Sequence, residues 1–173
     1  MNNTAVGLGN RDAKLVFYIR NRPPLPAYQN LTNICPLVAG EIAHICLETG
    51  NHWRKIFNVY AKLLFELQPK QFTSWQNLRD TALLQAESDQ CLLFSTPKLM
   101  ADLSGDKAAK KLHVILGKGY AEQLGLSQDC TWLSDDFAIN APLSIIICPY
   151  FDYRQLSNKK ISQLTGLIQQ LLP

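Results

Sequence analysis

The chain has 173 residues, of which 47% are hydrophobic and 18% charged, with a formal net charge of +3. This length fits one domain with its own core, and the composition excludes a disordered or fibrous protein. The five cysteines form no C-x-x-C pair, which indicates reduced thiols in a cytoplasmic protein and disfavours a zinc ribbon or an iron–sulfur cluster. We expect no metal, no cofactor and no membrane segment, because the longest apolar runs are far shorter than the roughly 20 residues of a membrane span.

The first strand is expected directly after the N-terminal segment. Residues 1–12 are polar, and we expect a flexible tail there, ahead of a single domain at 13–173. Residues 15–19 (LVFYI) form a continuous apolar, β-prone run, which is typical of a strand buried on both faces. The prolines that follow this run exclude a helix or a central strand and predict an extended loop.

Three helices are predicted before the second strand. Residues 37–48 form the first, which Gly50 ends. The second begins at Asn51, ends before Pro69, and carries its apolar side chains at the spacing of one helix face. The third is expected to begin with Thr73 or Ser74 as its cap and to reach residue 85.

The second half of the chain alternates apolar strands with helices. Strands are expected at 91–94, 112–116 and 143–148, a short helix at 119–124, a short edge strand or hairpin within 131–139, and a C-terminal helix after Ser157. Apolar strands separated by helices favour parallel pairing with helices on both faces, so the fold class is predicted as α/β with a short, mostly parallel sheet.

Ligands of such sheets bind beyond the carboxyl ends of the strands. The loops that follow the predicted strands are therefore expected to share one rim: 20–30, 95–98, 117–119 and 149–156.

The first rim loop contains Arg20, Asn21, Arg22 and Tyr28 among prolines. A rigid loop can hold Asn21 at a strand end, while the two arginines are available to bind phosphate. The alternative is a proline-stiffened connection with solvated arginines.

The last rim loop contains Tyr150, Phe151, Asp152, Tyr153 and Arg154. Aromatic faces stack on bases, and arginine adds cation–π or phosphate contacts. This loop is the best candidate for a binding site in the sequence. The alternative is that two aromatic rings cover the end of the sheet while Asp152 pairs locally with Arg154.

Two further basic positions lie next to predicted helix starts. Lys118, between two glycines, follows a strand and could bind an anion with the backbone amides around it. His52, Arg54 and Lys55 form a basic cluster in the first turn of a helix, where they are candidate contacts to a nucleic-acid backbone. For Lys118 the alternative is a simple strand-to-helix turn. For the basic cluster the alternative is a solvated helix face.

The order of these segments resembles the uracil-DNA glycosylase superfamily, most closely its mismatch-specific branch, over residues 14–172. That branch has a strand ending in Leu-Gly-Lys, a connection containing tryptophan, a strand with an Asn/His-Pro-Ser loop, and a last helix. The matching segments are residues 116–123 (LGKGYAEQ), Trp132, the strand at 145–148 with Pro149, residues 19–23 (IRNRP) and residues 51–55 (NHWRK).

The resemblance implies a three-layer α/β/α fold with a short, mostly parallel four-stranded central sheet, and a pocket that takes a flipped base. Asn21 matches the family residue that positions the attacking water. Cys148 and Pro149 fall where the second motif begins, with Cys148 in the place of an Asn or His that stabilises the leaving base. A thiol is a poor donor to a developing anion.

The sequence therefore predicts a divergent glycosylase-like domain that binds DNA, a nucleobase or another nucleobase-containing ligand at the rim. Asn21 or Asp152 would position water for excision of a base, and Tyr28, Tyr150 or Phe151 would stack on that base. One alternative is a non-catalytic α/β domain that binds a small molecule or a protein partner. Another is an unrelated α/β hydrolase-type enzyme that uses Asp152.

Overall fold

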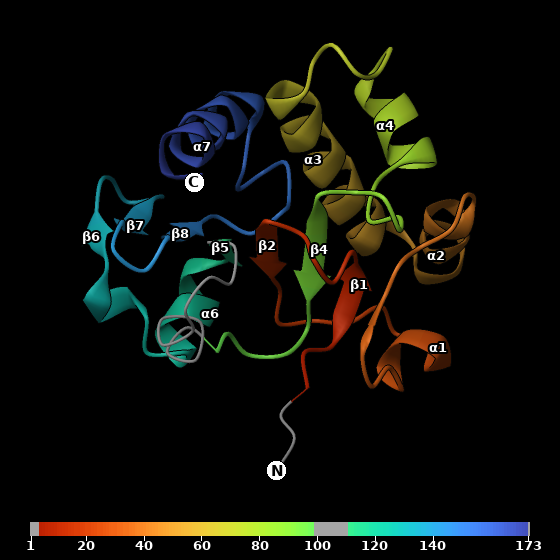
Figure 1. Cartoon of the computed structure of the whole chain (residues 1–173), viewed down its shortest axis with the longest axis horizontal. Helices are drawn as coiled ribbons and strands as arrows, with labels where there is room; N and C mark the ends of the chain where they lie inside the picture. The colour runs from red at the N-terminus through yellow and green to blue at the C-terminus, as the bar shows by residue number, and fades with distance from the viewer. Residues whose placement is uncertain (1–3, 99–110, 173) are drawn as a thin grey trace.

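The computed structural model describes residues 4–98 and 111–172. The strands of these residues form one mixed sheet of eight strands, in the order β3-β1-β4-β2-β5-β8-β7-β6 (Figure 1). In chain order the strands are β1 (Gly7–Gly9), β2 (Leu15–Tyr18), β3 (Ile34–Cys35), β4 (Gln90–Leu93), β5 (Leu112–Leu116), β6 (Thr131–Trp132), β7 (Ala138–Asn140) and β8 (Ile145–Cys148).

Helices cover both faces of this sheet, as Figure 1 shows, with α3, α4 and α7 on one side and α6 on the other. In chain order the helices are α1 (Pro26–Gln29), α2 (Glu41–Thr49), α3 (Asn51–Leu67), α4 (Trp75–Thr81), α6 (Lys118–Gln123), the 3₁₀ turn η1 (Ser127–Asp129) and α7 (Asn158–Leu171). The predicted α/β class is thus confirmed.

The predicted four-stranded sheet is wrong. The four central strands β4, β2, β5 and β8 are parallel to one another, but four more strands extend the sheet at its two ends. Of these, β1 is antiparallel to β4 and β7 is antiparallel to β8, so the whole sheet is mixed. Each added strand has two or three residues, which is too short to give the apolar run that marks a buried strand in a sequence.

The N-terminal segment also differs from the prediction of a flexible tail. Gly7–Gly9 forms β1, and Leu8 is 1% exposed between β3 and β4. Gly7 passes so close to the carbonyl of Leu92 that a Cβ atom would collide with it, which explains a glycine in a strand. The first three residues of the predicted tail lie outside the described residues.

Helix ends differ from the predicted ends where local pairing competes with the helix. The helix expected from 37 begins at Glu41. Leu37 instead forms an isolated parallel bridge with Gln85, and its N–H donates to the carbonyl of Leu84 (2.8 Å). The helix expected to reach 85 ends at Thr81, and Leu84 has a φ of 57°. At the start of that helix the predicted cap is confirmed, since Ser74 Oγ accepts the Asn77 N–H (3.0 Å).

The core consists of two layers divided by the sheet. Alternate residues of β2 point to opposite faces, so that Phe17 belongs to the layer under α3 and Tyr18 to the layer under α6. In the first layer the rings of Phe17 and Tyr60 have centroids 4.6 Å apart. This packing fixes α3 against the sheet and brings its N-terminal end to the edge where β2 and β8 end.

Within residues 4–98 and 111–172, no helix combines the length and apolar character needed to cross a membrane. In the same part of the chain, no three His, Cys, Asp or Glu side chains gather where they could hold a metal ion. The five cysteines are free thiols.

Candidate functional site

The carboxyl ends of the four central strands lie along one edge of the sheet, because these strands are parallel. At this edge the loop after β8 meets the first turn of α3, where the Tyr150 hydroxyl lies 2.9 Å from Nε2 of His52. We call the residues gathered here the rim cluster: Arg20, Asn21, His52, Lys55, Tyr150, Asp152, Tyr153 and Arg154.

Tyr150 lies at the centre of the rim cluster. Its ring lies 5.9 Å from that of His52, and Asn21 and Arg20 act on its hydroxyl from the end of β2. Burial raises the pKa of Tyr150 above its ordinary value, while a hydrogen bond with Asn21 and the charge of Arg20 partly offset this rise. The phenol therefore stays neutral at physiological pH, able to donate or accept a hydrogen bond.

The turn after β5 passes next to Tyr150 and contains a glycine with a left-handed backbone conformation. Gly117 has a φ of +108°, and its N–H donates to the carbonyl of Cys148 (2.9 Å). A Cβ atom on Gly117 would lie 3.8 Å from the Tyr150 ring. The space is thus sufficient, and the backbone conformation is what requires glycine here.

Asp152 connects the loop after β8 to α3. Its Oδ2 lies 3.7 Å from Nζ of Lys55, and its Oδ1 accepts the backbone N–H of Arg154 (2.9 Å). Both carboxylate oxygens are therefore engaged within the protein. The local-pairing alternative expected Arg154 as the charge partner of Asp152. The ion pair is instead with Lys55 on α3, and Arg154 contributes its backbone N–H.

Tyr153 presents an aromatic face between two cations. Its ring centroid lies 5.3 Å from Nζ of Lys55 and 5.7 Å from the guanidinium carbon of Arg154. Tyr153 is 53% exposed. Both cations lie over the ring, so a planar ligand can stack on it in place of one of them, and the displaced cation can then contact an anionic group of the ligand.

A basic cavity of about 180 Å³ adjoins Tyr153 on the exposed side of α3. The charged side chains that line it in the described chain are Arg54, Lys55 and Lys62. Sequence reasoning found the first two and missed Lys62. The spacing in the sequence could have identified Lys62, because it lies seven residues after Lys55 and therefore on the same helix face.

A model of the Family of unknown function (DUF6942) matches residues 6–169. The chain belongs to this family. No curated protein and no solved structure matches the chain. All residues of the rim cluster lie within the matched segment of this DUF6942 protein, but the family carries no assigned chemistry. The resemblance to the uracil-DNA glycosylase superfamily stays a prediction, and the site has to be interpreted from its geometry.

Two predicted ligand contacts from the first loop serve the protein's own structure instead. The guanidinium of Arg22 donates to three backbone carbonyls, those of Tyr28 (3.2 Å), Gln29 (2.9 Å) and Leu31 (3.4 Å). Tyr28 is 5% exposed and donates its hydroxyl hydrogen to Glu41 (3.0 Å). These contacts hold α1 in place, so neither side chain is available to a ligand at the rim.

Three predicted contacts from the last loop lie in the core. Cys148 and Phe151 are fully buried, and Pro149 is buried as well. Cys148 Sγ donates to the carbonyl of Ile115 (3.6 Å), and burial raises the pKa of its thiol. The ring of Phe151 packs against Phe17 and Tyr60. The loop thus turns Tyr150 and Tyr153 outward and these three residues inward.

Lys118 lies near the rim cluster but is directed at a neighbouring element. Its Nζ lies 4.7 Å from the ring centroid of Trp132. Arg20 also reaches toward α6, where it donates to Gln123 Oε1 (3.1 Å). Both remain exposed, so they extend the positive surface of the rim cluster toward the β6–β7 hairpin.

Proposed function

We propose that this DUF6942 protein binds a nucleic acid with accessible bases at the rim cluster. The observation that carries the proposal is the placement of Tyr153, a half-exposed ring with the cations of Lys55 and Arg154 over it. Cations bind the phosphate backbone, and aromatic faces stack on bases whatever their sequence. The rim cluster combines these two kinds of group on one surface.

The size of the adjoining cavity also favours this ligand. Pockets for small molecules usually measure about 300–1,000 Å³, whereas this cavity measures about 180 Å³. Its basic lining along α3 suits a polymer that passes over the surface and leaves part of itself in solvent. Binding of a small molecule or of a protein partner is the alternative, and salt separates these cases because phosphate contacts weaken steeply with added salt.

Base excision is the reaction that the glycosylase resemblance adds to this proposal. In that reaction a water oxygen forms a bond to the sugar C1′ and the water releases one proton, while the C1′–N bond breaks and the base leaves with the electron pair and takes up one proton. Asn21, which is exposed at the end of β2, would hold the water. The buried thiol of Cys148 cannot reach the base, so His52 and Tyr150 are the hydrogen-bond donors that the rim cluster offers to the leaving base.

A base-excision assay tests the catalytic part of the proposal. Oligonucleotides with uracil, hypoxanthine or ethenocytosine, single-stranded or in mismatched duplexes, are incubated with the wild type and with the Asn21→Ala, His52→Ala and Asp152→Ala variants. Alkali-labile abasic sites that form with the wild type and not with Asn21→Ala support excision with Asn21 as the water-positioning residue. If the protein retains DNA but forms no product, it is a binding domain without this activity. If it neither forms product nor retains DNA, the whole proposal is contradicted.

A further inference from the structure

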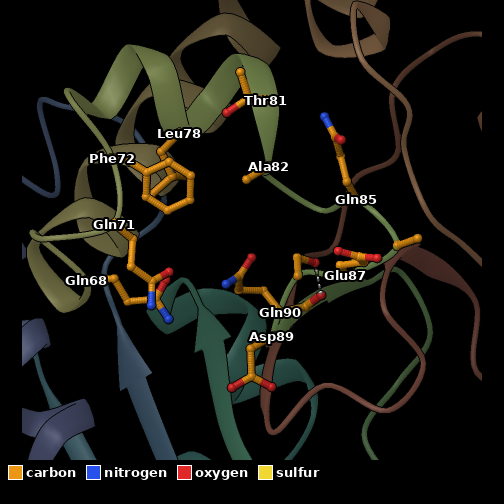
Figure 2. Close-up of a pocket in the computed structure, with 12 residues that line it drawn as sticks. Gln68, Gln71, Phe72, Leu78, Thr81, Ala82, Gln85, Glu87, Asp89 and Gln90 are labelled. Carbon is orange, nitrogen blue, oxygen red and sulfur yellow. Dashed lines mark hydrogen bonds between the residues drawn. The ribbon is translucent and has the colours of Figure 1, made fainter.

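A larger cavity lies at the opposite edge of the sheet, where β4 begins. It measures about 500 Å³, is open to solvent, and is lined by residues that follow α3, by α4 and by the loop that leads into β4 (Figure 2). This volume is within the range of small-molecule sites. The residues that line it are Gln68, Gln71, Phe72, Leu78, Thr81, Ala82, Gln85, Ala86, Glu87, Ser88, Asp89 and Gln90.

Gln90 is the unusual member of this set. It is 7% exposed, and its backbone carbonyl accepts hydrogen bonds from the Asn10 N–H (3.1 Å) and the Ser88 hydroxyl (3.2 Å). Its side-chain amide forms no hydrogen bond with any residue that the structure describes. Figure 2 shows this amide directed from the strand into the cavity. Among the described residues, only Ser127 has a fully buried side-chain polar atom without a partner, so the Gln90 amide is reachable from the cavity, and a ligand there can take up its hydrogen bonds.

The lining of the cavity combines an apolar wall with amide and carboxylate groups. Phe72, Leu78 and Ala82 supply an apolar wall above the Gln90 amide, and Gln68 and Gln71 approach it from one side (Figure 2). The charged residues among the described lining are both acidic, Glu87 and Asp89. Asp89 already accepts the backbone N–H of Lys14 (3.3 Å), which leaves Glu87 as the more available carboxylate.

We propose that this cavity binds a small organic cation, an amine or a guanidinium compound with a short aliphatic chain. The aliphatic part packs on Phe72 and Leu78, and the N–H groups donate to the amide oxygen of Gln90 and to Glu87. An anion finds no positively charged side chain among the described lining residues. The site lies at the amino ends of the parallel strands, away from the rim cluster, and is independent of the nucleic-acid proposal.

Calorimetric titration at low salt with three four-carbon probes tests this proposal. Putrescine carries two amines, 1,4-butanediol is its neutral counterpart and succinate its anionic one. Wild-type protein should bind putrescine and should bind the other two at least about tenfold more weakly. Absence of putrescine binding, or equal binding of putrescine and 1,4-butanediol, would overturn the proposal.

Variants then locate the binding. Gln90→Met keeps the approximate shape of the side chain and should weaken putrescine binding about tenfold, since it removes a hydrogen bond to a charged group. Glu87→Gln, at an exposed position where folding is not at risk, should weaken binding about threefold. Glu122→Gln, which removes an exposed carboxylate on α6 outside both sites, is the matched control and should leave putrescine affinity unchanged. A folded Glu87→Gln variant with wild-type affinity would refute the cation site.

Discussion

Nε2 of His52 and the hydroxyl of Tyr150 lie 2.9 Å apart, although the two residues are 98 positions apart in the chain. The contact joins the first turn of α3 to the loop after β8. It explains how a basic helix start and an aromatic loop, separate in the sequence, form one surface at the carboxyl edge of the sheet.

A double-mutant cycle should measure this contact. Tyr150→Phe keeps the ring and removes the hydroxyl, and His52→Ala removes its partner. Because the hydrogen bond is close to solvent, we expect a coupling of about 0.5–1 kcal/mol in the free energy of unfolding, determined by urea denaturation. Additive effects of the two substitutions would show that the side chains do not interact in solution.

Truncation of two aromatic residues of the same loop should affect different properties of the protein, stability in one case and DNA binding in the other. Phe151 is fully buried against Phe17 and Tyr60, so Phe151→Ala should lower the free energy of unfolding by about 3–5 kcal/mol. Tyr153→Ala should change this free energy by less than about 0.5 kcal/mol, yet weaken binding to single-stranded DNA by about fivefold or more.

The two variants serve as controls for each other, since both remove a ring within three positions of the loop. Chemical denaturation reports stability, and fluorescence anisotropy with a labelled oligonucleotide reports binding. Loss of stability in Tyr153→Ala, together with unchanged DNA binding, would contradict the assignment of Tyr153 as a stacking surface.

The alkaline stability of the protein should depend on Cys91. Burial raises the pKa of this thiol to about 12 from an ordinary value of 9.0, an effect that the charge of Lys111 partly opposes. Between these values the folded chain holds a proton that the unfolded chain has released. The free energy of unfolding should therefore fall as the pH rises from 9 toward 12. Burial of Cys148 and Tyr60 acts in the same direction.

Urea denaturation at a series of alkaline pH values tests this dependence. Cys91→Ala removes one titrating group, so its stability should fall less steeply with pH than that of the wild type. Cys35→Ala, at a partly exposed position, is the matched control and should follow the wild-type slope. Identical slopes in all three proteins would show that the Cys91 thiol does not titrate with unfolding.

The central strands could be predicted from the sequence, and so could a short hairpin within 131–139, which is formed by β6 and β7. The strands at the other edge of the sheet, β1 and β3, could not be predicted. The runs that became β2, β5 and β8 are long and apolar, and burial between two layers of helices requires that composition. β1 contains two glycines around Leu8 and has no such pattern. Its pairing depends on the close approach of Gly7 to the backbone of Leu92, a tertiary contact with no local signature.

The location of the candidate site could be predicted, but the orientation of its side chains could not. Parallel strands place the loops after β2 and β8 at one edge, which brought Asn21 near Tyr150 as expected. Which aromatic residue of the last loop faces solvent depends on how the loop packs on Phe17 and Tyr60. The inward turn of Arg22 depends likewise on three carbonyls that α1 and the residues after it supply.

The measurement that tests the rim cluster most directly is the salt dependence of single-stranded DNA binding in two charge-matched variants. Lys55→Ala/Arg154→Ala removes the two cations beside Tyr153. Lys14→Ala/Lys70→Ala removes two exposed cations at the opposite end of the strands and of α3. Fluorescence anisotropy with a labelled oligonucleotide gives the affinity at each salt concentration.

The rim variant should bind more weakly than wild type, and the slope of log affinity against log salt should become shallower by about 1.4, or about 0.7 for each phosphate that the variant no longer neutralises. The opposite-edge variant should keep the wild-type slope. Equal slopes in the two variants, or binding by wild type that does not respond to salt, would contradict nucleic-acid binding at the rim cluster.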